Sequence, residues 1–214
     1  MTDTTLPAVP DGDADVPDIP YDEYELPKGT EDPGGMSMPV MGTVLFIASE
    51  IMFFATLLGA YFTLKAGNPD WPPADIPELE LGLPLILTAI LITSSFSMHG
   101  AVWGIRNNNR PVFVSSLAIT VLLGVMFLFG EVFDAIAVEF GFDSGAYGSI
   151  FFTILTFHGL HVTGGVIFIS YLLFGAINGR FSADDYQPIE SASYYWHFVD
   201  IVWIFVFATL YWVQ

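Results

Sequence analysis

The amino-acid sequence predicts an all-α integral membrane protein, a bundle of five transmembrane helices preceded by a disordered acidic N-terminal tail. Hydrophobic residues make up 53% of the 214 residues and the mean hydropathy is +0.59, both high for a soluble domain of this size. Five apolar stretches are also long enough to cross a bilayer, which takes a helix of about 20 residues. The predicted spans cover about residues 39–65, 83–104, 111–137, 148–176 and 191–213.

Residues 1–35 form a separate acidic region ahead of the five-span domain, residues 36–214. The region holds ten acidic residues against the single base Lys28, and its six prolines interrupt any helix. It has no basic start and no apolar core, so it does not read as a signal peptide. The tail is therefore interpreted either as a docking arm for a basic partner or as a solvated leader.

Composition excludes several classes of function. The sequence has no cysteine, which excludes disulfides and thiolate-bound zinc, iron–sulfur or copper centres. Its net charge is −18 with only five Lys and Arg residues, so nucleic acid is not an expected partner.

The fourth span is the stretch around which the others are expected to pack. It carries His158 and His161 in a long run without Asp, Glu, Lys or Arg, and the i, i+3 spacing predicts that both imidazoles share one helical face. Small residues lie on or beside that face and allow a neighbouring helix to approach closely. They are Thr156, Gly159, Thr163 and Gly164.

Three acids lie in the first and third apolar stretches. Glu50, in the first span, is expected to face the bundle interior, because a carboxylate exposed to hydrocarbon is costly. It is read either as a proton-active or partner-pairing group or as a structural hydrogen bond. Glu131 and Asp134 lie near the end of the third span. The favoured account leaves them at headgroup level, and the alternative has them hydrogen-bonding to the fourth span or to another subunit.

The fifth span adds a polar pair, His197 and Asp200, again at i, i+3. The two side chains are expected to bond to each other or to reach the fourth span, since polar groups in a bilayer must be satisfied internally. The second span is rich in Ser and Thr, which suits hydrogen bonds between helices. Aromatic residues at both ends of the fifth span predict belts at the two membrane interfaces. They are Tyr195, Trp196, Tyr211 and Trp212.

No motif for a catalytic or metal centre is present. The sequence lacks HExxH and Glu-x-x-His, and a bis-histidine haem would require His161 together with His99 or His197 from another helix. No catalytic residue and no metal ligand is therefore predicted. This profile is typical of a lipid-embedded subunit of a larger machine, with an independent carrier or haem protein as the alternative.

Basic residues predict the orientation. With five spans, Lys28, Arg106, Arg110 and Arg180 fall on one side of the membrane and Lys65 on the other. The positive-inside rule then places the amino terminus in the cytoplasm and the carboxyl terminus outside.

Three sequence blocks resemble subunit III of the haem-copper respiratory oxidases, of the cytochrome c oxidase type. They are Ser49–Phe54 (SEIMFF), Gly148–Phe152 followed by Phe157–Val162 (FHGLHV), and Tyr195–Trp203 (YWHFVDIVW). The likeness covers about residues 38–213 in the family's order and spacing. The family usually has seven helices, so the resemblance implies a five-helix form that lacks the first two and the lipid-binding residues of the second. Glu131 stands where the family often has Gln, and Asp134 where it often has Glu.

The resemblance implies a subunit without its own haem or copper, which the partner subunits of a proton-pumping oxidase would hold. Such a subunit packs against subunit I, accompanies subunit II, holds structural phospholipids and supports proton uptake and stable turnover, with cytochrome c as electron donor; a quinol oxidase is the alternative. The expected location is a bacterial or archaeal plasma membrane. Glu50 matches the family's carbodiimide-reactive acid, and the resemblance implies a partner for it on the His158/His161 face, with His161 preferred.

Overall fold

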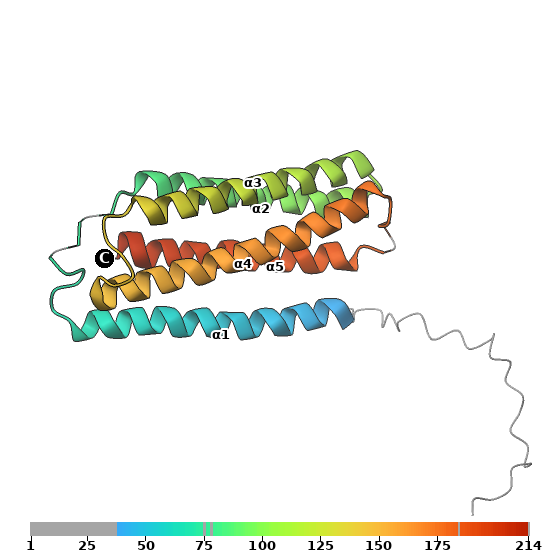
Figure 1. The fold of residues 1–214 in the computed structure, drawn as a ribbon. Helices are drawn as coiled ribbons and strands as arrows, with labels where there is room; N and C mark the ends of the chain where they lie inside the picture. Colours follow the sequence, from blue (N-terminus) through green and yellow to red (C-terminus); the bar gives the residue numbers. More distant parts are fainter. Residues whose placement is uncertain (1–37, 75, 78, 184, 214) are drawn as a thin grey trace, which may run out of the picture. The chain divides into compact units, whose positions relative to one another are not determined.

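The computed structural model describes residues 38–74, 76–77, 79–183 and 185–213. Over these residues the chain forms five long helices followed by one π-helical turn (Figure 1). They are α1 (Met38–Gly67), α2 (Gly82–Arg106), α3 (Arg110–Ala137), α4 (Gly145–Ile177), α5 (Gln187–Phe207) and the π turn η1 (Ala208–Trp212). The predicted acidic tail, residues 1–35, lies outside the described residues.

Each predicted span corresponds to one of these helices, so the all-α membrane fold is confirmed, and α5 with η1 forms the fifth span. The helices α3 and α5 each have a proline at one of their first two positions, where the missing amide N–H is not needed. At the start of α3 the Asn109 side chain accepts a hydrogen bond from the Val112 backbone N–H, 3.3 Å away. These residues thus fix where α3 and α5 begin.

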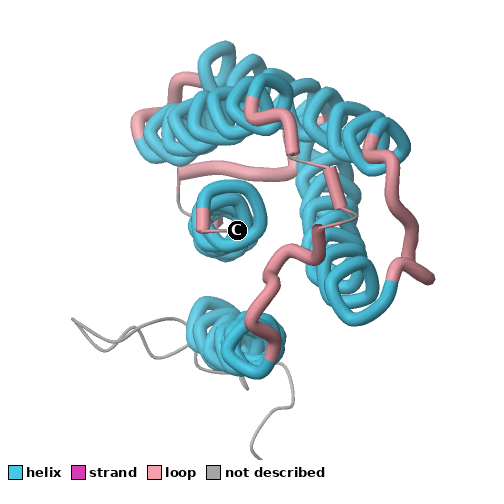
Figure 2. The backbone as a smooth tube through the Cα atoms, turned by 90° about the vertical axis from the view of Figure 1, so that its left-hand side faces the viewer, coloured by secondary structure: helices cyan, strands magenta, loops and turns pink. Residues whose placement is uncertain are grey.

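Successive helices run antiparallel, and α5 lies in contact with α1, α2 and α4 (Figures 1 and 2). Twelve residues of α5 are buried, whereas α1 buries only Val40, Phe54 and Tyr61. The α1 helix packs mainly on α4 and α5, on the opposite side from α2 and α3 (Figure 2). The bundle therefore has a central helix, α5, and an edge helix, α1.

Two tryptophans hold α5 in place. The Trp196 ring packs where a side chain on Gly124 or Gly165 would stand, since an added Cβ would lie 2.7 Å and 2.9 Å from its ring atoms. Its indole N–H donates to Ser94, and that of Trp203 donates to Thr88, each over 2.9 Å. The hydroxyl groups of the second span therefore bond between helices, as predicted.

The predicted aromatic belts are wrong for two of their members. Trp196 is fully buried and Tyr211 is 3% exposed, so both belong to the core, whereas Trp212 is exposed. An aromatic residue near a helix end reads as an interfacial anchor in the sequence, but here small residues on neighbouring helices make room for it inside the bundle.

Candidate functional site: two carboxylate–histidine pairs on one helix

Glu50 and His161 meet between the edge helix α1 and α4. Glu50 Oε2 lies 2.9 Å from His161 Nε2, while His161 Nδ1 lies 2.6 Å from the Phe157 carbonyl oxygen. A carbonyl oxygen only accepts, so Nδ1 carries a proton and donates it. The Nε2–Oε2 contact then holds one further proton, borne either by the carboxyl group or by the imidazole. The Glu50–His161 pair therefore shares one proton between α1 and α4.

Aromatic rings cover most of this pair. The Phe54 ring meets the His161 ring edge-on at a centroid distance of 4.9 Å, and the Phe53 ring stacks on it at 6.1 Å. The Tyr195 hydroxyl donates to the His161 carbonyl oxygen over 3.0 Å, which ties the same turn of α4 to α5. The two side chains still remain 16% and 19% exposed, so the pair lies at the edge of the bundle.

His158 and Glu131 form a second pair in the core. His158 Nδ1 lies 3.3 Å from Glu131 Oε1, and the two side chains are 0% and 6% exposed. The rings of Phe127 and Trp203 enclose the imidazole at centroid distances of 5.7 Å and 4.9 Å. His158 therefore contacts Glu131 of α3, and the structure does not place it beside Glu50 as a second partner.

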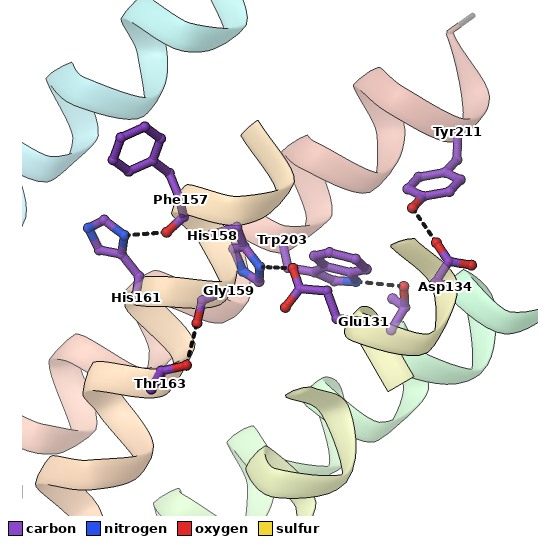
Figure 3. Close-up of polar contacts among 10 residues, drawn as sticks. Glu131, Asp134, Phe157, His158, Gly159, His161, Thr163, Trp203 and Tyr211 are labelled. Atoms are coloured by element: carbon purple, nitrogen blue, oxygen red, sulfur yellow. Dashed lines mark hydrogen bonds and ion pairs between the residues drawn. The ribbon is translucent and has the colours of Figure 1, made fainter. Parts of the chain in front are cut away.

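The two histidines diverge although they are only three residues apart (Figure 3). Three residues rotate about 60° short of a full turn and rise about 4.5 Å along the axis. Because α1 and α3 approach α4 from different directions, that rotation is enough to send His161 toward α1 and His158 toward α3. The prediction of a single histidine face is thus corrected to two faces with separate partners.

Asp134 is also buried and has a partner that the sequence analysis did not name. The Tyr211 hydroxyl, in the π turn η1, donates to Asp134 Oδ2 over 2.6 Å (Figure 3). Glu131 and Asp134 are 5% and 8% exposed, so both lie inside the bundle, while their headgroup-level depth in the membrane stays a prediction. Glu131 bonds to the fourth span, as the alternative account had it, and Asp134 bonds to the last turn of the fifth.

His197 and Asp200 meet through a residue of α2. Ser95 Oγ donates to Asp200 Oδ2 and lies 3.0 Å from His197 Nδ1. A hydroxyl has one proton to give, so His197 Nδ1–H donates to Ser95 in turn. The expected contacts, with each other or with the fourth span, are replaced by this bridge to the second. Ser95 was not singled out because a serine in an apolar stretch carries no sign of its partner.

The ionisable groups of the bundle lie in separate contacts and do not form one cluster. Among the described residues, no three His, Cys, Asp or Glu side chains come together as a metal ligand set. Chemically, each carboxylate–imidazole contact can hold a proton inside an apolar bundle and cross-link two helices. The fold and these contacts define a multi-pass helical membrane protein whose buried polar groups join its helices.

Comparison with known proteins shows which family of membrane proteins this chain is similar to. The sequence profile described as "Cytochrome c oxidase subunit III" matches residues 33–214. A relative from Synechocystis sp., named cytochrome c oxidase subunit 3, is 38% identical over 179 residues, covering 83% of this chain and 77% of the relative. Relatives of the same name from Pongo pygmaeus and Aedes aegypti are each 38% identical, and each comparison covers 80% of this chain and 68% of the relative.

The chain belongs to the cytochrome c oxidase subunit III family. It is accordingly a membrane subunit of a haem-copper oxidase, the oxidoreductase complex of aerobic respiration, and the alternative of a quinol oxidase subunit is not favoured by these relatives.

Proposed function

We propose that this chain is the non-catalytic subunit that packs against subunit I of a cytochrome c oxidase, beside subunit II, in a bacterial or archaeal plasma membrane. In this role it holds structural lipid and supports proton uptake and stable turnover. The haems and copper reside in the partner subunits, and cytochrome c is the electron donor to the complex.

The Glu50–His161 pair is the observation that carries this proposal. A proton shared over 2.9 Å, within a partly exposed contact at the edge of the bundle, is reachable from the membrane side. Left against lipid tails, two such polar groups would be costly. A neighbouring subunit that covers α1 and α4 would complete their burial, and a proton held there would lie next to the complex that consumes and pumps protons.

A groove beside the same helices suits the acyl chain of a phospholipid. It has a volume of about 500 Å³ and opens between α1, α4 and α5, with a mainly apolar lining. The lining includes Phe46 and Phe168, with the glycines Gly42 and Gly164 leaving room between the helices. An elongated apolar ligand can lie there without displacing a buried polar contact.

Orientation follows from the charges at the two ends of the bundle. Arg106 at the end of α2, Arg110 at the start of α3 and Arg180 after α4 lie at one end, and Lys65 lies at the other. By the positive-inside rule the arginine end faces the cytoplasm, which leaves the carboxyl terminus outside.

Purification of the tagged full-length chain from its own membranes tests the proposed assembly. We expect it to bring down an oxygen-consuming complex with the haem spectrum of subunit I and a second subunit bearing a soluble dicopper domain. A second subunit without those copper ligands would point to quinol as donor. A chain that purifies alone and keeps a haem absorption band would overturn the proposal.

The absence of cysteine allows a clean test of orientation. Asn68 and Asn107 are exposed residues just beyond opposite ends of the bundle, so cysteines placed there make a matched pair. A membrane-impermeant maleimide added to intact cells should label Asn68→Cys and leave Asn107→Cys unlabelled until the cells are opened. The reverse pattern would contradict the orientation and leave the assembly proposal standing.

A further inference from the structure

A pocket lies at one end of the bundle, and Asp134 in its wall is one helical turn from Glu131 of the core pair. Its volume is about 390 Å³, and it lies between Pro77, Leu79 and Glu80 of the loop before α2, the start of α2, the end of α3 and the π turn η1. Exposed Glu80 and Glu139 contribute to its lining. Two carboxylates beside such an opening raise the local concentration of cations, including protons.

Buried carboxylates continue inward from this pocket. Asp134 and Tyr211 are both in its wall, and both are less than a tenth exposed. Glu131 lies one turn deeper on α3, on the same helical face as Asp134, because residues three apart are neighbours on a helix. Figure 3 shows the order from Tyr211 and Asp134 to Glu131 and His158. The core pair is thus one helical turn from the wall of an open pocket.

The core pair has an unfilled hydrogen-bonding position. His158 Nε2 is buried and has no hydrogen-bond partner among the described residues. If the imidazole is charged, Nε2 is a donor without an acceptor, and if it is neutral with Nδ1–H toward Glu131, Nε2 is an acceptor without a donor. Either state is costly in an apolar bundle, and a water molecule relieves it.

The same end of the bundle contains a further buried polar atom without a partner. The Tyr147 hydroxyl has no hydrogen-bond partner among the described residues, while the Trp71 indole N–H and the Tyr61 hydroxyl beside it interact with each other. Their rings form one cluster, with Trp71 5.4 Å from Tyr61 and 5.1 Å from Tyr147 between centroids. Tyr147 also packs at 5.6 Å on Phe140, a lining residue of the pocket. Internal water at this end would satisfy the Tyr147 hydroxyl.

We propose that this pocket is the mouth of an aqueous inlet that passes Asp134 and Tyr211 and ends on the Glu131–His158 pair. Water in the inlet lets the core pair exchange protons with the side of the membrane that the pocket faces. The Glu50–His161 pair lies between α4 and α1 and is not part of this route. The proposed orientation decides only which side of the membrane the pocket faces, and the inlet itself does not depend on it.

Cysteine accessibility in the assembled oxidase tests the inlet. A small cationic methanethiosulfonate reacts with thiolates, which form in water and not in hydrocarbon. We expect Asp134→Cys and Glu131→Cys to react at least about tenfold faster than Val132→Cys, which lies at the same depth on an exposed face of α3. Equal, slow reaction at all three positions would overturn the inlet.

Blocking the mouth provides the second arm of the test, in chains that keep Glu131. Ala137 lines the pocket and neighbouring Ile136 is exposed outside the lining. In the native complex, a water-soluble carbodiimide with an amine should modify Asp134. Ala137→Trp should suppress that modification and Ile136→Trp should not. Unmodified Asp134, or equal labelling in both tryptophan variants, would contradict the proposal.

The side from which the reagents act separates this inference from the proposed orientation. In sealed cells, modification should come from outside, the side of the loops 68–81 and 138–144. Modification only from the cytoplasmic side would leave the inlet intact and refute the orientation.

Discussion

The two carboxylate–histidine pairs have the same chemistry and opposite surroundings. Both imidazoles come from α4, three residues apart, and each meets a glutamate from a neighbouring helix. At the edge, Glu50 and His161 keep 19% and 16% of their side chains exposed, whereas the core pair Glu131 and His158 keeps 6% and 0%. The difference teaches that one helix can place a proton-binding group open to the membrane and a cross-link closed to the membrane within one turn of each other.

Removing the imidazole of the core pair should have the largest effect. His158→Leu leaves the Glu131 carboxyl group buried without its partner, and losing one member of a buried pair costs about 3–5 kcal/mol. We expect the chain to be depleted from the purified oxidase and the midpoint of heat denaturation to fall. Normal stoichiometry with an unchanged midpoint would show that the core pair is not a cross-link.

Crowding the core pair should have the next largest effect. A Cβ on Gly159 would lie 2.8 Å from Glu131 Oε2, so Gly159→Ala must displace the carboxylate, at a cost of about 1–3 kcal/mol. Gly164→Ala is the matched control on the same helix, because its Cβ would meet only the Tyr195 hydroxyl, at an ordinary 3.7 Å. Heat denaturation of the two variants should separate them, and an equal shift would argue against a tight Glu131 site.

The edge pair should tolerate a neutral substitute. Glu50→Gln keeps a side-chain amide that can donate to His161 Nε2, so we expect a loss of about 1 kcal/mol or less. Subunit content and heat stability should match the native complex, while proton uptake during sustained turnover should slow. Depletion of the chain as severe as in His158→Leu would erase the distinction between edge and core.

An exposed ion pair at the end of the bundle sets the lower limit of the series. Arg106 and Glu190 lie 2.6 Å apart, with side chains 48% and 21% exposed. Exposed pairs are screened by water and salt, so Arg106→Gln should change stability by less than about 1 kcal/mol. Denaturation curves that coincide within error at physiological salt are the expected result. A loss comparable to that of Gly159→Ala would require an additional role for this arginine.

Hydropathy alone was enough to predict the five helices, because a long run of apolar residues directly indicates a membrane-spanning segment. The partners of the buried side chains were harder to predict from the sequence. The preference for His161 as the partner of Glu50 followed from the family resemblance, whereas the contact of His158 with Glu131 depends on how α3 and α4 cross. Helical spacing predicts where a side chain lies around its own helix axis, but not which neighbouring helix packs on that side.

The hydroxyl partners were the hardest residues to anticipate. Ser95 joins His197 to Asp200, and Tyr211 bonds to Asp134 from a π-helical turn at the end of the chain. Serine and tyrosine are common in membrane helices and signal no particular partner. A search for hydroxyl groups able to satisfy each buried acid would have narrowed the choice without selecting these two.

Labelling with an apolar carbodiimide tests most directly the claim that the edge pair is reachable from the membrane and the core pair is closed to it. After treatment of the native oxidase, peptide mass spectrometry should find the adduct on Glu50, none on Glu131, and no replacement adduct on this chain in Glu50→Gln. An adduct on Glu131, or labelling that persists undiminished in Glu50→Gln, would contradict the account.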